Sequence, residues 1–147
     1  MSICVYGRIN KKCINTDLLE KIIVDYFSLS KNVVKQRNKT SVTYEGVSKE
    51  DKIIISFVSE KKPPYNVFDS DIINGEYKYM QLIIFDIRKE ESTIDIYKKI
   101  INFCIYIRSK IESDILVTSD AHDEICLLKK QDIIWNSNLS VKDVKEE

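Results

Sequence analysis

Two segments of helical periodicity flank several short β-type segments, and this arrangement limits what the chain can fold into. Apolar residues recur at three- and four-residue steps in residues 19–27 and again in residues 97–111, which is the period of an amphipathic helix. Residues 42–47, 52–58 and 77–88 lie between them and combine alternation with β-branched and aromatic runs, as strands do. Because the strands are grouped instead of alternating with helices, the pattern predicts an α+β fold.

Both ends of the chain are also expected to form strands. Similar β-type runs occupy residues 2–9, 114–119, 124–129 and 133–135. Asn15 or Thr16 is expected to cap the first helix, because either side chain can accept a hydrogen bond from a free amide of the first turn. The expected order is strand, helix, three strands, helix and two or three strands. We therefore predict a two-layer sandwich in which a largely antiparallel sheet carries both helices on one face.

The length of 147 residues suits a single domain. We assign residues 1–138 to this domain and expect the charged residues 139–147 to be disordered. The longest apolar runs are far too short to span a membrane. In residues 1–12 the basic side chains follow the apolar stretch, which is the reverse of the order in a signal peptide. A cytoplasmic protein without membrane contact is expected.

Residues 60–76 are predicted to form a long loop, because Pro63 and Pro64 lack the amide donor that a central strand needs. Asp69, Asp71 and Glu76 are expected to be exposed in this loop. Several aromatic residues lie close to these acids and either contribute to a protein interface or line the sheet. They are Tyr65, Phe68, Tyr77 and Tyr79.

The formal net charge of zero hides an asymmetry along the chain. Residues 1–62 contain 12 basic and 7 acidic side chains, whereas residues 63–147 contain 11 basic and 16 acidic ones. Nucleic-acid binding usually requires a basic face, so direct binding to nucleic acid is not expected. An acidic surface on the second half would instead attract a basic protein and accelerate association.

His122 is the only histidine, and it lies in the polar segment from Asp120 to Glu124. A neighbouring carboxylate could orient the imidazole for proton transfer, but the same residues are also typical of a hairpin turn. Three adjacent turn residues rarely converge on one metal ion, so no metal is predicted there. The glycines form no phosphate-binding loop, so no cofactor is predicted.

The four cysteines show no spacing of the kind that binds zinc. Cys4, Cys104 and Cys126 each lie inside an apolar run, and we expect them to be small buried hydrophobic residues. Reduced thiols agree with a cytoplasmic protein. Trp135 either completes the core or serves as an edge-strand anchor for a partner.

The second half of the chain also contains a recognisable succession of apolar segments. Leu82-Ile83-Ile84-Phe85-Asp86 is followed by a capped helix and then by three short segments. These segments are Asp114-Ile115-Leu116-Val117-Thr118-Ser119, Glu124-Ile125-Cys126-Leu127-Leu128 and Ile133-Ile134-Trp135-Asn136. Over about residues 80–136 this pattern resembles small immunity proteins of bacterial polymorphic-toxin and contact-dependent growth inhibition systems.

The resemblance implies a cytoplasmic inhibitor that binds the C-terminal domain of one cognate toxin, often a nuclease, and blocks its active site or substrate surface without catalysis. Charge and expected exposure then select the candidate contacts. They are Asp69, Asp71, Glu76, Asp120, His122, Asp123 and Glu124. A small regulatory or ligand-binding domain, which could pair with a second copy through an edge strand, is the alternative. An enzyme that uses His122 is the third hypothesis.

Overall fold

The computed structural model describes residues 3–27, 34–37, 41–44, 53–61, 63, 66–87, 93–120 and 123–136, and these form an α+β fold. The helices are α1 (Thr16–Phe27) and α2 (Thr93–Arg108). The strands are β1 (Ile3–Ile9), β2 (Val34–Arg37), β3 (Ser41–Tyr44), β4 (Ile53–Val58), β5 (Val67–Ser70), β6 (Gly75–Lys78), β7 (Gln81–Ile87), β8 (Ile115–Ser119), β9 (Asp123–Leu128) and β10 (Ile133–Trp135). The predicted fold class is confirmed.

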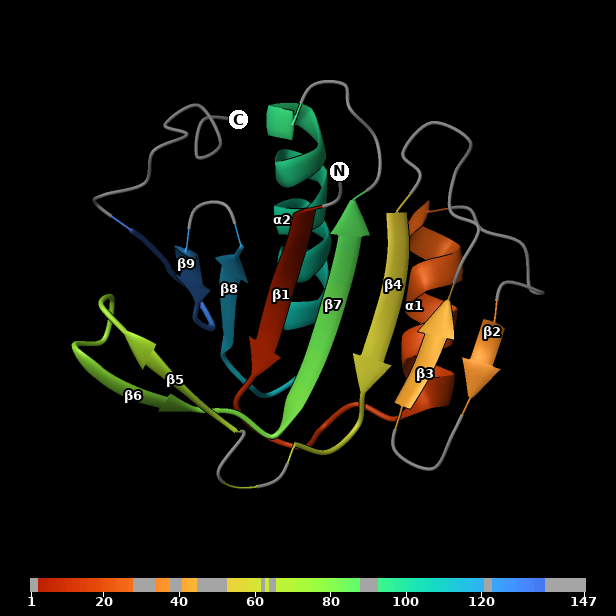
Figure 1. Cartoon of the computed structure of the whole chain (residues 1–147), viewed down its shortest axis with the longest axis horizontal. Helices are drawn as coiled ribbons and strands as arrows, with labels where there is room; N and C mark the ends of the chain where they lie inside the picture. The colour runs from red at the N-terminus through yellow and green to blue at the C-terminus, as the bar shows by residue number, and fades with distance from the viewer. Residues whose placement is uncertain are drawn as a thin grey trace.

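The larger sheet contains eight strands in the order β10-β9-β8-β1-β7-β4-β3-β2 (Figure 1). Every pairing between its described strands is antiparallel. β7 pairs with both β1 and β4, so its apolar run lies in the middle of the sheet, as expected of a strand that is buried on both faces. β5 and β6 form a separate two-stranded sheet.

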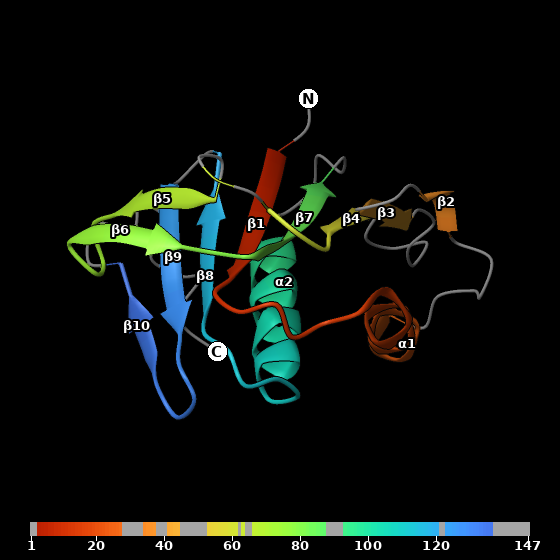
Figure 2. The same ribbon diagram turned by 90° about the horizontal axis from the view of Figure 1, so that it is seen from below.

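Both helices pack on the same face of the sheet, as the view along its edge shows (Figure 2). The predicted apolar stripe of α1 is buried there through Leu19, Ile22 and Ile23. α1 also contacts α2 through Tyr26 and Phe103, whose ring centroids lie 4.9 Å apart. The main hydrophobic core therefore lies between the helices and one sheet face, in the predicted two-layer arrangement.

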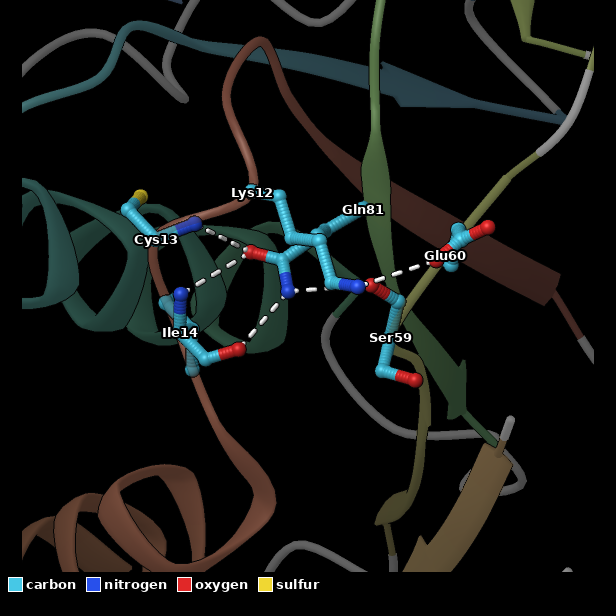
Figure 3. A network of polar contacts seen from close by, with 6 residues as sticks. All are labelled: Lys12, Cys13, Ile14, Ser59, Glu60 and Gln81. Carbon is cyan, nitrogen blue, oxygen red and sulfur yellow. Dashed lines mark hydrogen bonds and ion pairs between the residues drawn. The ribbon is translucent and has the colours of Figure 1, made fainter. Parts of the chain in front are cut away.

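The start of α1 is attached to the sheet by polar contacts. Asn15 Oδ1 accepts the amide of Leu18 at 2.7 Å, so Asn15 is the N-cap. Just before it, Gln81 of β7 accepts the amides of Cys13 and Ile14 at 3.0 Å and donates to the carbonyl of Ile14 at 2.7 Å (Figure 3). Gln81 also donates to the carbonyl of Ser59 at 3.1 Å, so one buried side chain joins this segment to two neighbouring strands.

One loop prediction and one strand prediction were wrong. Residues 60–76 are not one long loop, because β5 and the first half of β6 form a hairpin there. Residues 77–88 are not one strand either, because the chain leaves the ladder at Tyr79 and Met80 between β6 and β7. The segment of β2 was assigned to no element. The predicted tail, 139–147, lies outside the described residues.

The β5–β6 hairpin covers part of the sheet face opposite the helices (Figure 2). A second apolar cluster is buried beneath it and joins strands from both sheets. Its buried members are Tyr77, Tyr79, Leu82, Leu116 and Leu127. The hairpin therefore adds a partial third layer to the expected two.

Cys104 and Cys126 are buried free thiols, as predicted. Burial raises the pKa of the Cys104 thiol to about 12, which keeps it protonated and unreactive. Cys4 is only partly buried and Cys13 is exposed, so the burial predicted for Cys4 was too high. Trp135 packs against the main core from the edge strand β10.

Candidate functional site

The β5–β6 hairpin has two chemically different faces. Phe68 and Tyr77 are opposite each other in register and belong to the apolar cluster on the sheet. Asp69 and Glu76 form the next opposed pair and are both exposed. Since successive side chains of a strand point to opposite faces, the hairpin directs aromatic rings inward and carboxylates outward. The described aromatic residues of this region thus line the sheet, which was one of the two predicted alternatives.

Glu124 of β9 holds the turn of this hairpin. Its carboxylate accepts the hydroxyl of Ser70 at 2.5 Å and the amide of Ile72 at 3.4 Å, and it also accepts the amide of Asp71. Ser70 Oγ accepts the amide of Ile73 at 3.3 Å. Consecutive amides that point toward one anion form a nest like that at a helix N-terminus. Here the anion comes from the protein itself.

The exposure expected for Glu124 was therefore wrong. Only 2% of this residue is exposed, because its carboxylate is enclosed by hydrogen-bond donors from the hairpin turn. A buried carboxylate is tolerated when several donors satisfy it. Glu124 positions the hairpin and is not available as a surface contact.

Arg8 of β1 contacts the hairpin on the face that packs against the main sheet. Its guanidinium carbon lies 4.6 Å from the ring centroid of Phe68 and 5.0 Å from those of Tyr6 and Tyr79. Nε donates to Thr118 Oγ1 at 3.3 Å, and a terminal nitrogen donates to the Tyr79 hydroxyl at 2.9 Å. Burial lowers the pKa of Arg8 from its usual value. The aromatic faces and hydroxyls around it stabilise the cation that burial disfavours.

The outer face of the hairpin contains a groove of about 500 Å³. Within the described residues it is lined by Pro63, Asn66, Val67, Asp69, Glu76 and Lys78. The groove brings together two of the predicted contact residues, Asp69 and Glu76, which are separated by a turn in the sequence. Sequence reasoning identified neither Asn66 nor Lys78 as part of a site.

The two carboxylates form no ion pair with the described part of the chain. Neither Asp69 nor Glu76 forms a side-chain hydrogen bond or an ion pair with a described residue, and the ammonium of Lys78 is not within 4 Å of either. Like charges directly opposite each other on antiparallel strands destabilise the pair. Unfavourable local arrangements such as this pairing of like charges are expected mainly at functional sites. The pair therefore forms a site suited to an external cation.

Asn66 lines the same groove. The residue is 8% exposed, and its carbonyl accepts the amide of Tyr79 at 2.9 Å. In the described part of the chain its side-chain amide has no hydrogen-bond partner.

The remaining predicted contacts are distributed more widely. Asp71 is exposed in the hairpin turn, and Asp120 is exposed at the end of β8. Burial and a hydrogen bond to Asp120 raise the pKa of the Tyr6 hydroxyl to about 12. His122 and the side chain of Asp123 lie outside the described residues. Asp120 thus belongs to a local cluster with Tyr6 and is not assigned to the groove.

A second groove, of about 440 Å³, lies between the end of α2 and the β9–β10 turn. Arg108, Lys129 and Lys130 line it together with Asp132. The Arg108 side chain is 11% exposed, donates to the carbonyl of Ile111 at 2.8 Å and lies 3.7 Å from Asp114. Its Nε is buried without a hydrogen-bond partner. This groove has an excess of positive charge.

Comparisons of the chain with protein-family models, with curated proteins and with solved structures found no match. Neither described helix has the length and apolar character needed to cross a membrane. Among the described residues, no group of three or more histidine, cysteine or acidic side chains is arranged to hold a metal ion.

Proposed function

We propose that this chain is an immunity protein that binds a bacterial toxin domain and blocks its active site or substrate surface. The observation that carries the proposal is the Asp69–Glu76 pair, two exposed carboxylates that form no ion pair with a described residue, on a firmly attached hairpin. The resemblance of residues 80–136 to immunity proteins supports the same function. The proposed site of action is the bacterial cytoplasm.

Charge and rigidity explain how such an inhibitor would act. A nuclease binds phosphates in a basic cleft, and carboxylates can occupy the positions of those phosphates. Opposite charges accelerate the encounter. Because Glu124 and Arg8 hold the hairpin in place, little conformational entropy is lost when it binds. Inhibition in this form requires no catalytic group from the chain.

The proposal is tested by growth rescue. The toxin-like segment encoded immediately upstream in the source DNA is expressed with this chain, and growth and co-purification are measured. We expect rescue by the native chain and at least about tenfold weaker toxin binding by D69N/E76Q, since two charged contacts are removed. The D25N/E112Q variant loses the same charge from two exposed acids elsewhere and should rescue fully.

Absence of rescue by a folded native chain would overturn the immunity function. If D69N/E76Q and D25N/E112Q lost binding equally, inhibition would depend on the overall charge of the protein. The hairpin would then not be part of the interface. Rescue that depends on the hairpin acids alone supports both the function and the site.

The second groove favours one alternative, a ligand-binding domain for a small anion. Arg108, Lys129 and Lys130 could bind a carboxylate or phosphate group. Thermal unfolding with inorganic phosphate tests this function. A rise in Tm that disappears in K129Q/K130Q but persists in K110Q, which alters an exposed lysine beside the Tyr106 ring, would support it. No rise in Tm would exclude phosphate as the ligand.

A further inference from the structure

Strand β10 forms one end of the eight-stranded sheet and pairs with β9 alone among the described strands (Figure 2). Just beyond β10, the amide of Asn136 donates to the carbonyl of Ile125 at 3.0 Å. Backbone groups of successive residues point alternately to the two sides of an antiparallel strand, so those of Ile134 also face β9. Ile133 and Trp135 therefore direct their N–H and C=O groups toward the open edge.

The residues of this edge are apolar on both faces. Ile133 and Trp135 pack against the main core on the helix side, whereas Ile134 points to the opposite face and is 38% exposed. Edge strands commonly carry charged residues or proline, which discourage pairing with another chain, but β10 contains neither. The amide of Ile133 donates to Asp132 Oδ1 at 2.9 Å. The other outward backbone groups of β10 face no strand in the described part of the chain.

The basic groove between α2 and the β9–β10 turn adjoins this edge on the helix side. Ile133 is one of its lining residues, and Arg108, Lys129 and Lys130 supply its positive charge. The side chain of Arg108 is 11% exposed, and its Nε is buried without a hydrogen-bond partner. The guanidinium thus retains donor capacity that the described residues do not use, and a carboxylate is the acceptor that matches its charge.

A strand added at the open edge would bring its side chains to this groove. Neighbouring strands lie about 4.8 Å apart, and the side chains of directly opposed residues point to the same face. The residue opposite Ile133 would therefore point to the helix side, beside the groove. The residue opposite Ile134 would cover the exposed side chain of Ile134 on the other face.

We infer that the β10 edge binds an extended segment of a partner protein, in antiparallel orientation, with an acidic side chain opposite Ile133 and an apolar one opposite Ile134. Addition of a strand to a sheet edge is a common mode of peptide recognition. Because β10 has only three residues, few backbone bonds form, and the acidic contact decides which segment binds. This surface contains neither Asp69 nor Glu76, so binding here does not depend on the toxin contact proposed for the hairpin.

A second copy of this chain fits the edge less well. Its own β10 has the sequence Ile133-Ile134-Trp135 and contains no acid, so pairing of two β10 strands would bring no carboxylate from either strand to the basic grooves. A small free anion would occupy the groove but leave the edge unpaired.

The experiment uses the intact chain and a short capped peptide with the sequence threonine, threonine, valine, glutamate and threonine. In antiparallel register, its glutamate lies opposite Ile133 and its valine opposite Ile134. Binding is followed by Trp135 fluorescence and by hydrogen exchange of the backbone amides. We expect saturable binding at low salt and slower exchange at the Trp135 amide, which faces the open edge. Exchange at the Ile134 amide, which faces β9, should not change.

Two altered peptides separate the contributions of charge and backbone. Glutamine in place of the glutamate should weaken binding at least about fivefold, because the charged contact with the groove is lost. An N-methyl group on the second threonine, which lies opposite Trp135, removes the N–H that pairs with the Trp135 carbonyl. It should also weaken binding at least about fivefold.

Two variants of the protein test the groove. K129Q/K130Q should lower the affinity for the glutamate peptide at least about threefold and leave the affinity for the glutamine peptide unchanged. K11Q/K21Q loses the same charge from two exposed lysines outside the groove and should bind like the native chain. The amide spectra of both variants verify that the fold is native.

Strand addition is refuted if the Trp135 amide gains no protection, if N-methylation leaves binding unchanged, or if the glutamine peptide binds as tightly as the glutamate peptide. Inorganic phosphate is the last probe, and phosphate binding as tight as that of the peptide would identify a small-anion site instead. A dimeric native chain with a protected Trp135 amide in the absence of peptide would assign the edge to a second copy. Growth rescue can succeed in each case, so the two functions fail separately.

Discussion

Acidic side chains have different roles in this protein, and the neighbouring residues decide which. Glu124 accepts three donors from the hairpin and is buried, whereas Asp69 and Glu76 are opposed and exposed without a described partner. The exposure of Asp69 and Glu76 was predicted correctly from the sequence. The exposure predicted for Glu124 was wrong, because the donors that enclose its carboxylate come from residues more than fifty positions away.

The opposed carboxylates lead to a prediction about stability. Glu76→Gln removes the repulsion from Asp69, so the free energy of unfolding should rise by about 0.5 kcal/mol at low salt, and the gain should shrink at high salt. Urea unfolding measures it. Glu112→Gln makes the same change at an exposed position and should have no comparable effect. A stability loss in Glu76→Gln would mean that the carboxylate is satisfied within the chain.

Tyr6 leads to a prediction about alkaline pH. Burial and the hydrogen bond to Asp120 raise its pKa to about 12 from the model-compound value of 10. The folded state thus favours the neutral phenol, and this contribution to stability is complete below pH 10 and is lost as pH rises toward 12. Tyr6→Phe should lose stability less steeply over that interval, measured by urea unfolding with Trp135 fluorescence. Equal steepness in both proteins would contradict the assignment to Tyr6.

The sequence predicted neither the β5–β6 hairpin nor β2, and the hairpin is the larger omission. Its strands have four residues each and expose polar side chains on one face, so their apolar signal is weak. Asn74, which adopts a positive φ of 56°, and Gly75 together form a dipeptide typical of hairpins. That signal was present, but Pro63 and Pro64 favoured a loop. The longer strands and both helices were predictable because their periodicity extends over more residues.

Attachment of this element is expected to depend on Glu124. Glu124→Gln replaces an acceptor oxygen with a donor that faces the amides of Asp71 and Ile72. We expect a loss of about 2 kcal/mol in the free energy of unfolding, with faster hydrogen exchange at those two amides than in the native chain. Unchanged exchange there would show that the aromatic contacts of Arg8 suffice to hold the turn.

At the scale of the whole molecule, Gln81 joins the first helix to the sheet. Gln81→Leu keeps a similar volume but leaves the amides of Cys13 and Ile14 without their acceptor. We expect a loss of about 3 kcal/mol and weaker exchange protection in α1 than in α2. Gln131→Leu, at an exposed position, is the control. Equal protection of both helices would mean that apolar packing alone holds α1.

By itself, the sequence determined the two helices, the main strands, the α+β class and the central position of β7, because these follow from local periodicity and from the burial of apolar runs. Only the tertiary structure decided the strand order, the layer formed by the β5–β6 hairpin, the burial of Glu124 and the groove with Asn66. The physical reason is that these features depend on pairings between distant segments. A local pattern specifies which face of a strand is apolar, but not which strand or side chain covers it.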